Sequence, residues 1–413
     1  MYTKMSMKRI YLLSCVLIAI IAASTVTYLL SQTPSGGSTS KETVYVGIAF
    51  GGTTTEQAKL LIDRTKNYTN LFILDCGINA ISLNKSAVEE ICAYATDAGL
   101  QIIVNLGTYT RQNWSWQNQL YLDIKSQYGD KFLGAYYDDE PAGVPLDWNW
   151  TKEFRLNPAP FGSRFSADMT SKLRTATETG NPPEEYTLEA KWFNWLISEN
   201  IGHKNLIANN ITTFTSDYAL YWYDYVVGYD TMFAQLGWNS SINQQISLLR
   251  GAAQLQNKDW GTIITWKYMQ PPYIDSADNI YEQMITSYNA GAKYITIFNY
   301  PYEDSTNPYG ILTDEHFKAL ERFWSQVVTK TSPTSAVARA VLVLPKDYGS
   351  GLRNPTDKIW GIWGPDEKSA PCYNNMEKLL MQYGLSLDIV YDDPAYPLQG
   401  NYSKIYYWNQ TIT

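Results

Sequence analysis

Apolar and polar positions follow two recurring patterns along most of the chain. Continuous apolar runs predict β-strands at residues 44–50, 71–77, 100–107, 131–140, 204–211, 230–237, 261–268 and 293–300. Segments with apolar residues at helical spacing predict helices at residues 54–68, 86–99, 116–130, 186–200, 216–226, 242–257, 276–292 and 313–328. Eight strands that are each followed by a helix predict an α/β fold of the (β/α)8 (TIM) barrel type.

The composition of the strands supports this prediction. Most of them are uninterrupted apolar runs, as expected for parallel strands that are buried on both faces. An open doubly wound sheet is the alternative. The sequence after the first strand, "AFGGTTTE", has two glycines but lacks the spacing of a phosphate-binding turn, which favours the barrel.

Four segments are expected in the chain. Residues 1–31 form a basic end and an apolar segment, residues 32–43 a flexible stalk, and residues 44–330 the barrel, with an insertion at about 141–183. After a short linker, residues 331–413 show the order strand, helix, strand, strand. This order predicts a small C-terminal α/β domain.

The N-terminal segment predicts where the protein resides. Lys4, Lys8 and Arg9 precede an uncharged stretch, Ile10 to Leu30, that is long enough to cross a bilayer. The basic flank would stay cytoplasmic, so the bulk of a single-pass membrane protein would be extracytoplasmic. A cleaved signal peptide, with a site near Ala22, is the alternative. We favour an uncleaved anchor because the apolar run continues past that site.

Potential glycosylation sites agree with export from the cytoplasm. The chain has eight Asn-X-Ser/Thr sequons, at Asn67, Asn84, Asn113, Asn149, Asn210, Asn239, Asn401 and Asn409.

Composition narrows the class of ligand. The formal net charge is -8, which argues against a nucleic-acid partner. Two His residues and four Cys residues without metal spacing predict no metal site, and no cofactor is expected. The 33 Tyr and 14 Trp residues suit carbohydrate faces, protein interfaces or a glycoprotein surface. Nothing in the sequence indicates an oligomeric state.

In a barrel of this kind, functional residues lie at the C-terminal ends of the strands. The predicted strand ends supply acids, amides and aromatic residues, which suit the hydroxyl groups and C–H faces of sugars. The candidates are Asp75, Asn105, Tyr137, Asp138, Asp139, Glu140, Asn209, Gln235, Trp238, Trp266, Lys267, Asn299, Tyr300 and Glu303.

The segment "FLGAYYDDEPAG" at the end of the fourth strand resembles the acid-bearing strand of (β/α)8 glycoside hydrolases. In the large retaining clan an Asn-Glu pair, often followed by Pro, carries the acid/base, and Asp139-Glu140-Pro141 stands in its place. In chitinase-like families an Asp-X-Glu ending has this role, which Asp138 and Glu140 match. Both resemblances imply that Glu140 is the proton donor. Because successive strand residues face opposite sides, Asp138 and Glu140 are expected to share a face while Asp139 points away.

The chain departs from the retaining clan at the seventh strand. That clan's nucleophile is a Glu at the end of this strand, where "TIITWKYMQPPY" has Trp266 and Lys267 and no acid before Asp275. A second carboxylate could come from Glu303 or Asp75, or an N-acetyl group of the substrate could attack with Asp138 or Asp139 as its helper.

Two functions therefore remain open. The first is a glycoside hydrolase that acts on an extracellular oligo- or polysaccharide, with Glu140 as the general acid assisted by Asp138, Asp139 or Glu303. The second is a catalytically inactive barrel that serves as a glycan-binding or structural cell-surface glycoprotein. A polysaccharide lyase or a deacetylase on a similar scaffold is less favoured, since deacetylases usually need metal ligands.

Overall fold

The computed structural model describes residues 43–77, 80–107, 116–156, 167–198, 201–238, 240–300, 306–331, 338–398 and 402–412. The expected membrane anchor, residues 32–42 of the expected stalk, and Glu303 lie outside these residues. Among the described residues, no helix combines the length and apolar character needed to span a bilayer. Residues from Thr43 onward form one compact unit.

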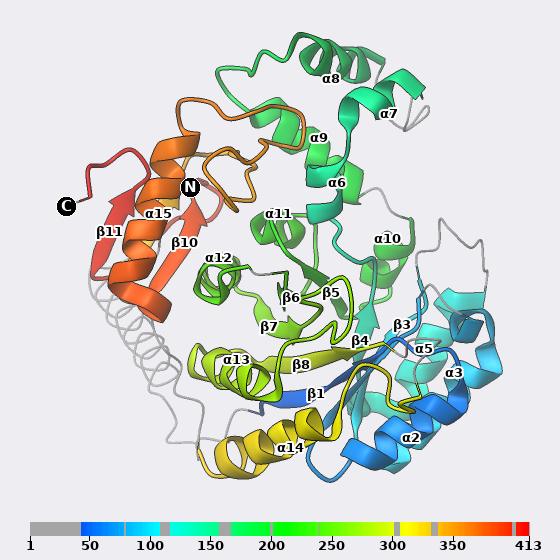
Figure 1. Cartoon of the computed structure of the whole chain (residues 1–413). Helices are drawn as coiled ribbons and strands as arrows, with labels where there is room; N and C mark the ends of the chain where they lie inside the picture. Colours follow the sequence, from blue (N-terminus) through cyan, green and yellow to red (C-terminus); the bar gives the residue numbers. More distant parts are fainter. Residues whose placement is uncertain are drawn as a thin grey trace, which may run out of the picture. The chain divides into compact units, whose positions relative to one another are not determined.

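Eight parallel strands close into a barrel, which confirms the predicted fold (Figure 1). The strands are β1 (Tyr45–Phe50), β2 (Leu71–Asp75), β3 (Gln101–Asn105), β4 (Phe132–Tyr136), β5 (Thr213–Asp217), β6 (Thr231–Leu236), β7 (Asp259–Ile264) and β8 (Tyr294–Asn299). Closure comes from β1 pairing with β8, where Phe50 lies opposite Asn299. The side chains that fill the interior include Ile73, Phe214 and Tyr294, so the barrel is packed rather than hollow.

Helices surround the barrel. They are α2 (Thr55–Thr65), α3 (Lys85–Asp97), α5 (Trp116–Tyr128), α9 (Thr187–Ser198), α10 (Ile201–Ala208), α11 (Tyr221–Val226), α12 (Ile242–Gln256), α13 (Ala277–Asn289) and α14 (Asp314–Phe323), with short turns η1 (Ala80–Leu83), η2 (Gly129–Lys131) and the π-helix η4 (Trp324–Val328). Their ends follow local chemistry: Thr54, for example, begins α2 with a capping box that it shares with Gln57.

The prediction of the fifth strand is wrong. Residues 204–211, read as a strand, belong largely to α10, and the strand is the more polar segment Thr213–Asp217. Its hydroxyl groups are buried but bonded, since Thr213 donates to Asp230 at 3.1 Å and Thr215 to the carbonyl of Asp138 at 2.5 Å. A strand made of hydroxyl-bearing residues gives no apolar run, so the pattern misses it.

The insertion after β4 contributes three helices, α6 (Gly143–Asp147), α7 (Trp150–Leu156) and α8 (Ala167–Thr179), of which α7 and α8 project at the top of Figure 1. Trp150 of α7 packs edge-on against Trp192 of α9, with ring centroids 4.8 Å apart.

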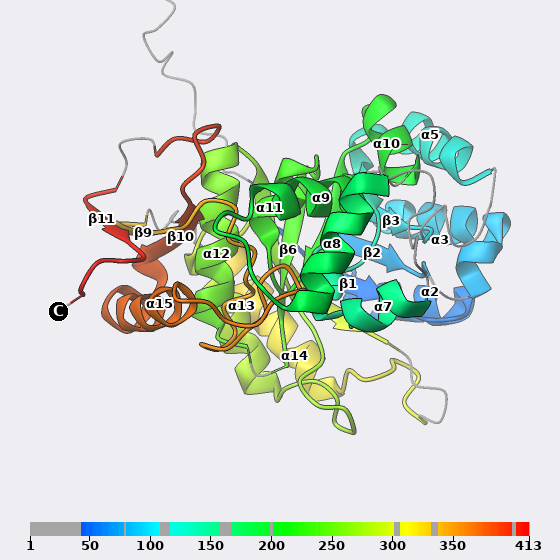
Figure 2. The same ribbon diagram turned by 90° about the horizontal axis from the view of Figure 1, so that it is seen from above.

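The C-terminal region forms a three-stranded parallel sheet in the order β10 (Leu387–Tyr391), β9 (Ala340–Leu344), β11 (Lys404–Tyr407), with α15 (Ser369–Tyr383) and the turn η5 (Gly384–Ser386). Figures 1 and 2 both place it beside α12, on the side away from α3 and α5. Gly251 of α12 allows this approach, because a Cβ there would lie 2.7 Å from the carbonyl oxygen of Ile389.

A buried ion pair joins the two parts. Arg250 Nε of α12 lies 2.7 Å from Asp388 Oδ1 of β10, and the Tyr402 hydroxyl donates to Asp388 Oδ2 at 2.9 Å. Along the chain, the elements β9, α15, β10 and β11 confirm the predicted order of strand, helix, strand, strand. The three described cysteines, Cys76, Cys92 and Cys372, are free and buried.

Candidate active site

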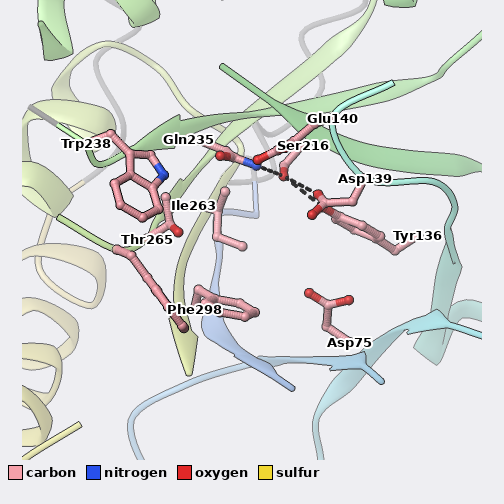
Figure 3. Close-up of a pocket in the computed structure, with 11 residues that line it drawn as sticks. Asp75, Tyr136, Asp139, Glu140, Ser216, Gln235, Trp238, Ile263, Thr265 and Phe298 are labelled. Carbon is pink, nitrogen blue, oxygen red and sulfur yellow. Dashed lines mark hydrogen bonds between the residues drawn. The ribbon is translucent and has the colours of Figure 1, made fainter. Parts of the chain in front are cut away.

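A pocket of about 130 Å³ opens at the C-terminal ends of the barrel strands (Figure 3). Its wall combines three carboxyl groups with hydroxyl, amide and aromatic side chains. The lining residues are Asp75, Tyr136, Asp139, Glu140, Ser216, Gln235, Trp238, Ile263, Thr265, Trp266 and Phe298. The sequence predicted six of them: Asp75, Asp139, Glu140, Gln235, Trp238 and Trp266.

Strand β4 delivers Asp139 and Glu140 together into the pocket, contrary to the expected alternation. The strand ends at Tyr136, and Asp138 and Glu140 each have a left-handed backbone with φ of 55°. Alternation of side chains holds only in extended backbone, so it fails beyond Tyr136. Asp138 is not among the lining residues, and the expectation that Asp138 and Glu140 share the functional face is wrong.

Tyr136 takes the place predicted for Tyr137. Tyr137 is buried on the other side of the strand, where its ring stacks on His203 with centroids 6.2 Å apart. Tyr136 instead donates a hydrogen bond to Asp139 Oδ1 at 2.5 Å.

Asp139 is held by a hydrogen-bond network shown in Figure 3. The Ser216 hydroxyl donates to Asp139 Oδ1 at 3.0 Å, and Gln235 Nε2 donates to the Ser216 oxygen at 2.9 Å. Both Tyr136 and Ser216 therefore stabilise the ionised form of Asp139.

Asp75 enters from β2 and faces the group formed by Tyr136 and Asp139 across the cavity in Figure 3. Asn105 Nδ2 donates to Asp75 Oδ1 at 2.6 Å, while the Asn105 oxygen accepts from the Gly107 amide at 2.8 Å. Asn105, predicted to bind substrate, lies behind Asp75 and orients it.

Asp217 at the end of β5 was not foreseen. Its carboxylate accepts hydrogen bonds from the backbone amides of Ala142 and Gly143 at 2.9–3.1 Å. These amides directly follow Glu140 and Pro141, so Asp217 fixes the loop that carries Glu140. A Cβ on Gly143 would lie 2.3 Å from Asp217 Oδ1, which explains the glycine. Ser216 and Asp217 were missed because the fifth strand was misplaced.

The carboxyl groups are enclosed without a cation, since no Lys or Arg from the described part of the chain lines the pocket. Burial, and then the charge of Asp139, raises the pKa of Asp75 to about 7 and that of Glu140 to about 7. Burial also raises the pKa of Asp139, against the opposing hydrogen bonds from Tyr136 and Ser216. At neutral pH, Asp75 and Glu140 are therefore each partly protonated.

Aromatic rings line the side of the pocket opposite Asp75 and Asp139 (Figure 3). Trp238 and Trp266 have centroids 6.5 Å apart, and Phe298 of β8 lines the pocket beside them. Tyr300, another predicted site residue, packs against Trp266 at 6.0 Å but is not among the lining residues.

The remaining predicted residues lie elsewhere. Lys267 pairs with Asp275 at 2.8 Å beside a separate cavity of about 260 Å³. Asn299 is buried at the end of β8 and does not line the pocket. Asn209 is exposed after α10, before β5 begins, and therefore at the barrel edge opposite the pocket.

Comparison with known proteins supports the fold alone. No protein-family model matches the chain. No curated protein matches it either. Among solved structures, the barrel is similar to a GH5_18 protein of Streptomyces cattleya in complex with GlcNAc, with a TM-score of 0.51 and 10% identity over 89% of this chain and 99% of that one.

Two further structures are less similar. A GH5_18 protein of Bifidobacterium longum has a TM-score of 0.46 at 8% identity, with 89% of this chain and 97% of that one covered. The β-mannanase of the blue mussel Mytilus edulis has a TM-score of 0.38 at 9% identity, with 69% and 92% covered. At 10% identity, the similarity to the Streptomyces cattleya structure shows that the chain shares its (β/α)8 barrel fold.

Proposed function

We propose that this protein is a glycoside hydrolase with Glu140 as its general acid. The observation that carries the proposal is the enclosure of Glu140 with Asp75 and Asp139 in one pocket at the C-terminal ends of the strands. A general acid must hold a proton near the working pH, and a carboxyl group with a pKa of about 7 does so.

The end of β7 argues against a covalent nucleophile from that strand. Thr265 and Trp266 occupy the position and carry no carboxylate. Asp75, on the other side of the cavity, is the second carboxyl group that we assign, as the base that activates water. This assignment predicts inversion at the anomeric carbon.

In the proposed reaction, Glu140 donates its proton to the glycosidic oxygen as the bond from that oxygen to the anomeric carbon breaks. A water oxygen bonds to the anomeric carbon from the opposite face and loses its proton to Asp75. Asp139 remains ionised and stabilises the positive charge that develops on the sugar ring.

The substrate class follows from the wall of the pocket. Trp238, Trp266 and Phe298 offer faces for the C–H surfaces of a sugar, and the acids and Gln235 offer partners for its hydroxyl groups. The structures named above include a GlcNAc complex and a β-mannanase, so β-mannosides and GlcNAc-containing oligosaccharides are the first substrates to test.

We further propose that the protein acts outside the cytoplasm, anchored by residues 10–30. In support, the sequon asparagines among the described residues, Asn67, Asn84, Asn149, Asn210 and Asn409, are all exposed. The apolar character of residues 10–30 supplies the anchor.

The test uses the chain from about Lys41 and its Glu140→Gln variant on a panel of β-linked oligosaccharides. Cleavage by the wild type that falls at least about 100-fold in Glu140→Gln is the expected result. Glu90→Gln, a change at an exposed acid on α3, is the matched control and should leave the rate unchanged. Proton NMR of the first product formed reports inversion or retention.

The absence of an acid at the end of β7 favours a second candidate, a barrel that binds glycans without cleaving them. Binding by the wild type and Glu140→Gln alike, with no cleavage by either, would support this candidate and reject the hydrolase.

A further inference from the structure

A second, larger cavity opens beside the catalytic pocket. It has a volume of about 640 Å³, about five times that of the pocket. Glu140 and Trp238 line both cavities. A ligand with its reacting bond at Glu140 can therefore continue past Trp238 into the larger space, here called the groove.

Trp238 lies at the junction in an unusual conformation. Its backbone has φ of 50°, in the left-handed region that a bulky residue rarely adopts, and its amide donates to the Trp266 carbonyl at 2.9 Å. The side chain is 44% exposed despite its large apolar ring. Backbone strain that holds an aromatic ring in solvent between two cavities indicates a binding surface rather than a core contact.

The far wall of the groove comes from the C-terminal region. Tyr373 and Glu377 lie on α15, one turn apart, and Arg353 lies in the loop before it. The barrel contributes Gln244 and Gln245 of α12 to the same groove. The groove is therefore incomplete without the C-terminal region.

A salt-bridge network connects this wall to α6, which follows the loop that carries Glu140. Arg353 makes a bidentate pair with Asp147, at 2.8 and 2.9 Å, and a second pair with Asp357 at 2.8 Å. The Tyr218 hydroxyl donates to Asp147 at 2.8 Å. Burial opposes ionisation of Asp147, but the bonds from Arg353 and Tyr218 hold its pKa below the ordinary value.

The charge of the groove limits its ligand. Two carboxylates neutralise Arg353, so that residue does not attract an anion. In the described part of the chain, the Glu377 side chain has no hydrogen bond or ion pair with another residue, so its negative charge faces the groove without a counter-charge. The groove should therefore accept neutral or amino sugars and repel uronic acids and sulfated sugars.

We propose that the groove binds the outer units of a non-acidic oligosaccharide, and that Tyr373 and Glu377 contact these units. This inference rests on the proposed function for the position of the reacting unit at Glu140. It makes the C-terminal region a determinant of chain-length specificity.

The experiment uses the Glu140→Gln variant, so that bound oligosaccharides are not cleaved. Calorimetry measures the affinity of this variant for disaccharides and tetrasaccharides of the β-1,4-mannose and chitin series. The tetrasaccharide of the preferred series should bind about tenfold more tightly than the disaccharide, as expected from one or two added hydrogen bonds. Adding Tyr373→Ala and Glu377→Gln should remove this gain and leave disaccharide binding unchanged. Met381→Ala, an exposed position on the same helix, is the control that should retain it.

If Tyr373→Ala fails to fold, Glu377→Trp replaces it, because that side chain would fill the groove from a partly exposed position. A tetragalacturonate should bind at least about tenfold more weakly than the neutral tetrasaccharide. Equal binding of disaccharide and tetrasaccharide, a gain that survives both groove variants, or no binding of any neutral chain would overturn the inference.

Cleavage by the wild type separates this inference from the proposed function. Cleavage without dependence on chain length would reject the groove and keep the hydrolase. Dependence on chain length in binding, without cleavage by the wild type, would reject the hydrolase and keep the groove.

Discussion

Buried acids occur at two places in this protein that differ in whether a cation lies beside them. Asp388, between α12 and the C-terminal sheet, has Arg250 at 2.7 Å and a hydrogen bond from Tyr402. Asp75, Asp139 and Glu140, at the mouth of the barrel, have only one another and neutral donors. Burial raises the pKa at both places, but only Asp388 has a cation that opposes it.

The difference separates structure from function. An acid with a matched cation and bonded oxygens joins two parts of a fold. Acids gathered without a cation cost stability, and folds retain such an arrangement where it serves chemistry. Clustered acids whose pKa is raised and that have no cation beside them are thus better candidates for a functional site than buried acids in general.

The largest expected effect is a loss of stability when the ion pair between Arg250 and Asp388 is broken. Asp388→Asn leaves Arg250 buried without its counter-charge and should lower the free energy of unfolding by about 3–5 kcal/mol. The double variant Arg250→Met/Asp388→Leu should recover most of this loss, since apolar residues of similar volume remove both desolvation costs. Urea denaturation measures both. A double variant as unstable as Asp388→Asn would contradict the role assigned to the pair.

The second prediction concerns the loop that carries Glu140. Gly143→Ala places a methyl group against Asp217 and should cost about 1–3 kcal/mol of stability as the loop shifts. If the loop positions the acid, the catalytic rate falls while the affinity for oligosaccharide changes little. Gly364→Ala, where a Cβ meets no atom and φ, as at Gly143, is not positive, controls for the loss of a glycine. Unaltered kcat in Gly143→Ala would contradict this role for the loop.

The third prediction is that the unpaired acids weaken the fold at high pH. A carboxyl group whose pKa rises on folding holds its proton more tightly in the folded chain, so its contribution is complete below about pH 4 and is lost as pH rises through about 7. Glu140→Gln cannot ionise and should be more stable than the wild type at pH 8 by roughly 1–3 kcal/mol. Thermal unfolding at pH 4 and pH 8 tests this, with Glu90→Gln unchanged at both. A destabilised Glu140→Gln at pH 8 would show that the acid is stabilised as an anion.

The smallest expected effect concerns the electrostatic interaction between Asp139 and Glu140. Asp139→Asn removes the negative charge beside Glu140, so the pKa of Glu140 should fall from about 7 toward its ordinary value. Titration of the Glu140 carboxyl carbon by NMR measures the shift. An unchanged pKa would mean that burial alone sets it.

The sequence predicts the barrel well because most strands are continuous apolar runs. It fails at β5, where Thr213, Thr215 and Ser216 are buried through hydrogen bonds rather than by apolar character. Because the fifth strand was predicted at residues 204–211, Ser216 and Asp217 were not predicted as site residues, and Asn209 was wrongly expected at the C-terminal end of a strand.

The site shows a second limit. Strand alternation predicted that Asp138 would face the pocket, but the left-handed backbone at Asp138 and Glu140 reorders the side chains. A backbone conformation of this kind has no signature in a sequence of acids followed by proline. Glu140 itself was predictable, because its place at a strand end does not depend on the alternation.

The most direct test of the central claim compares leaving groups. Glu140→Gln and the wild type are assayed on an unactivated oligosaccharide and on an aryl glycoside of the same sugar whose phenol leaves without protonation. We predict a loss of at least about 100-fold on the oligosaccharide and a much smaller loss on the aryl glycoside, since only the first needs a general acid. Equal losses on both substrates would contradict the assignment of Glu140 as the proton donor.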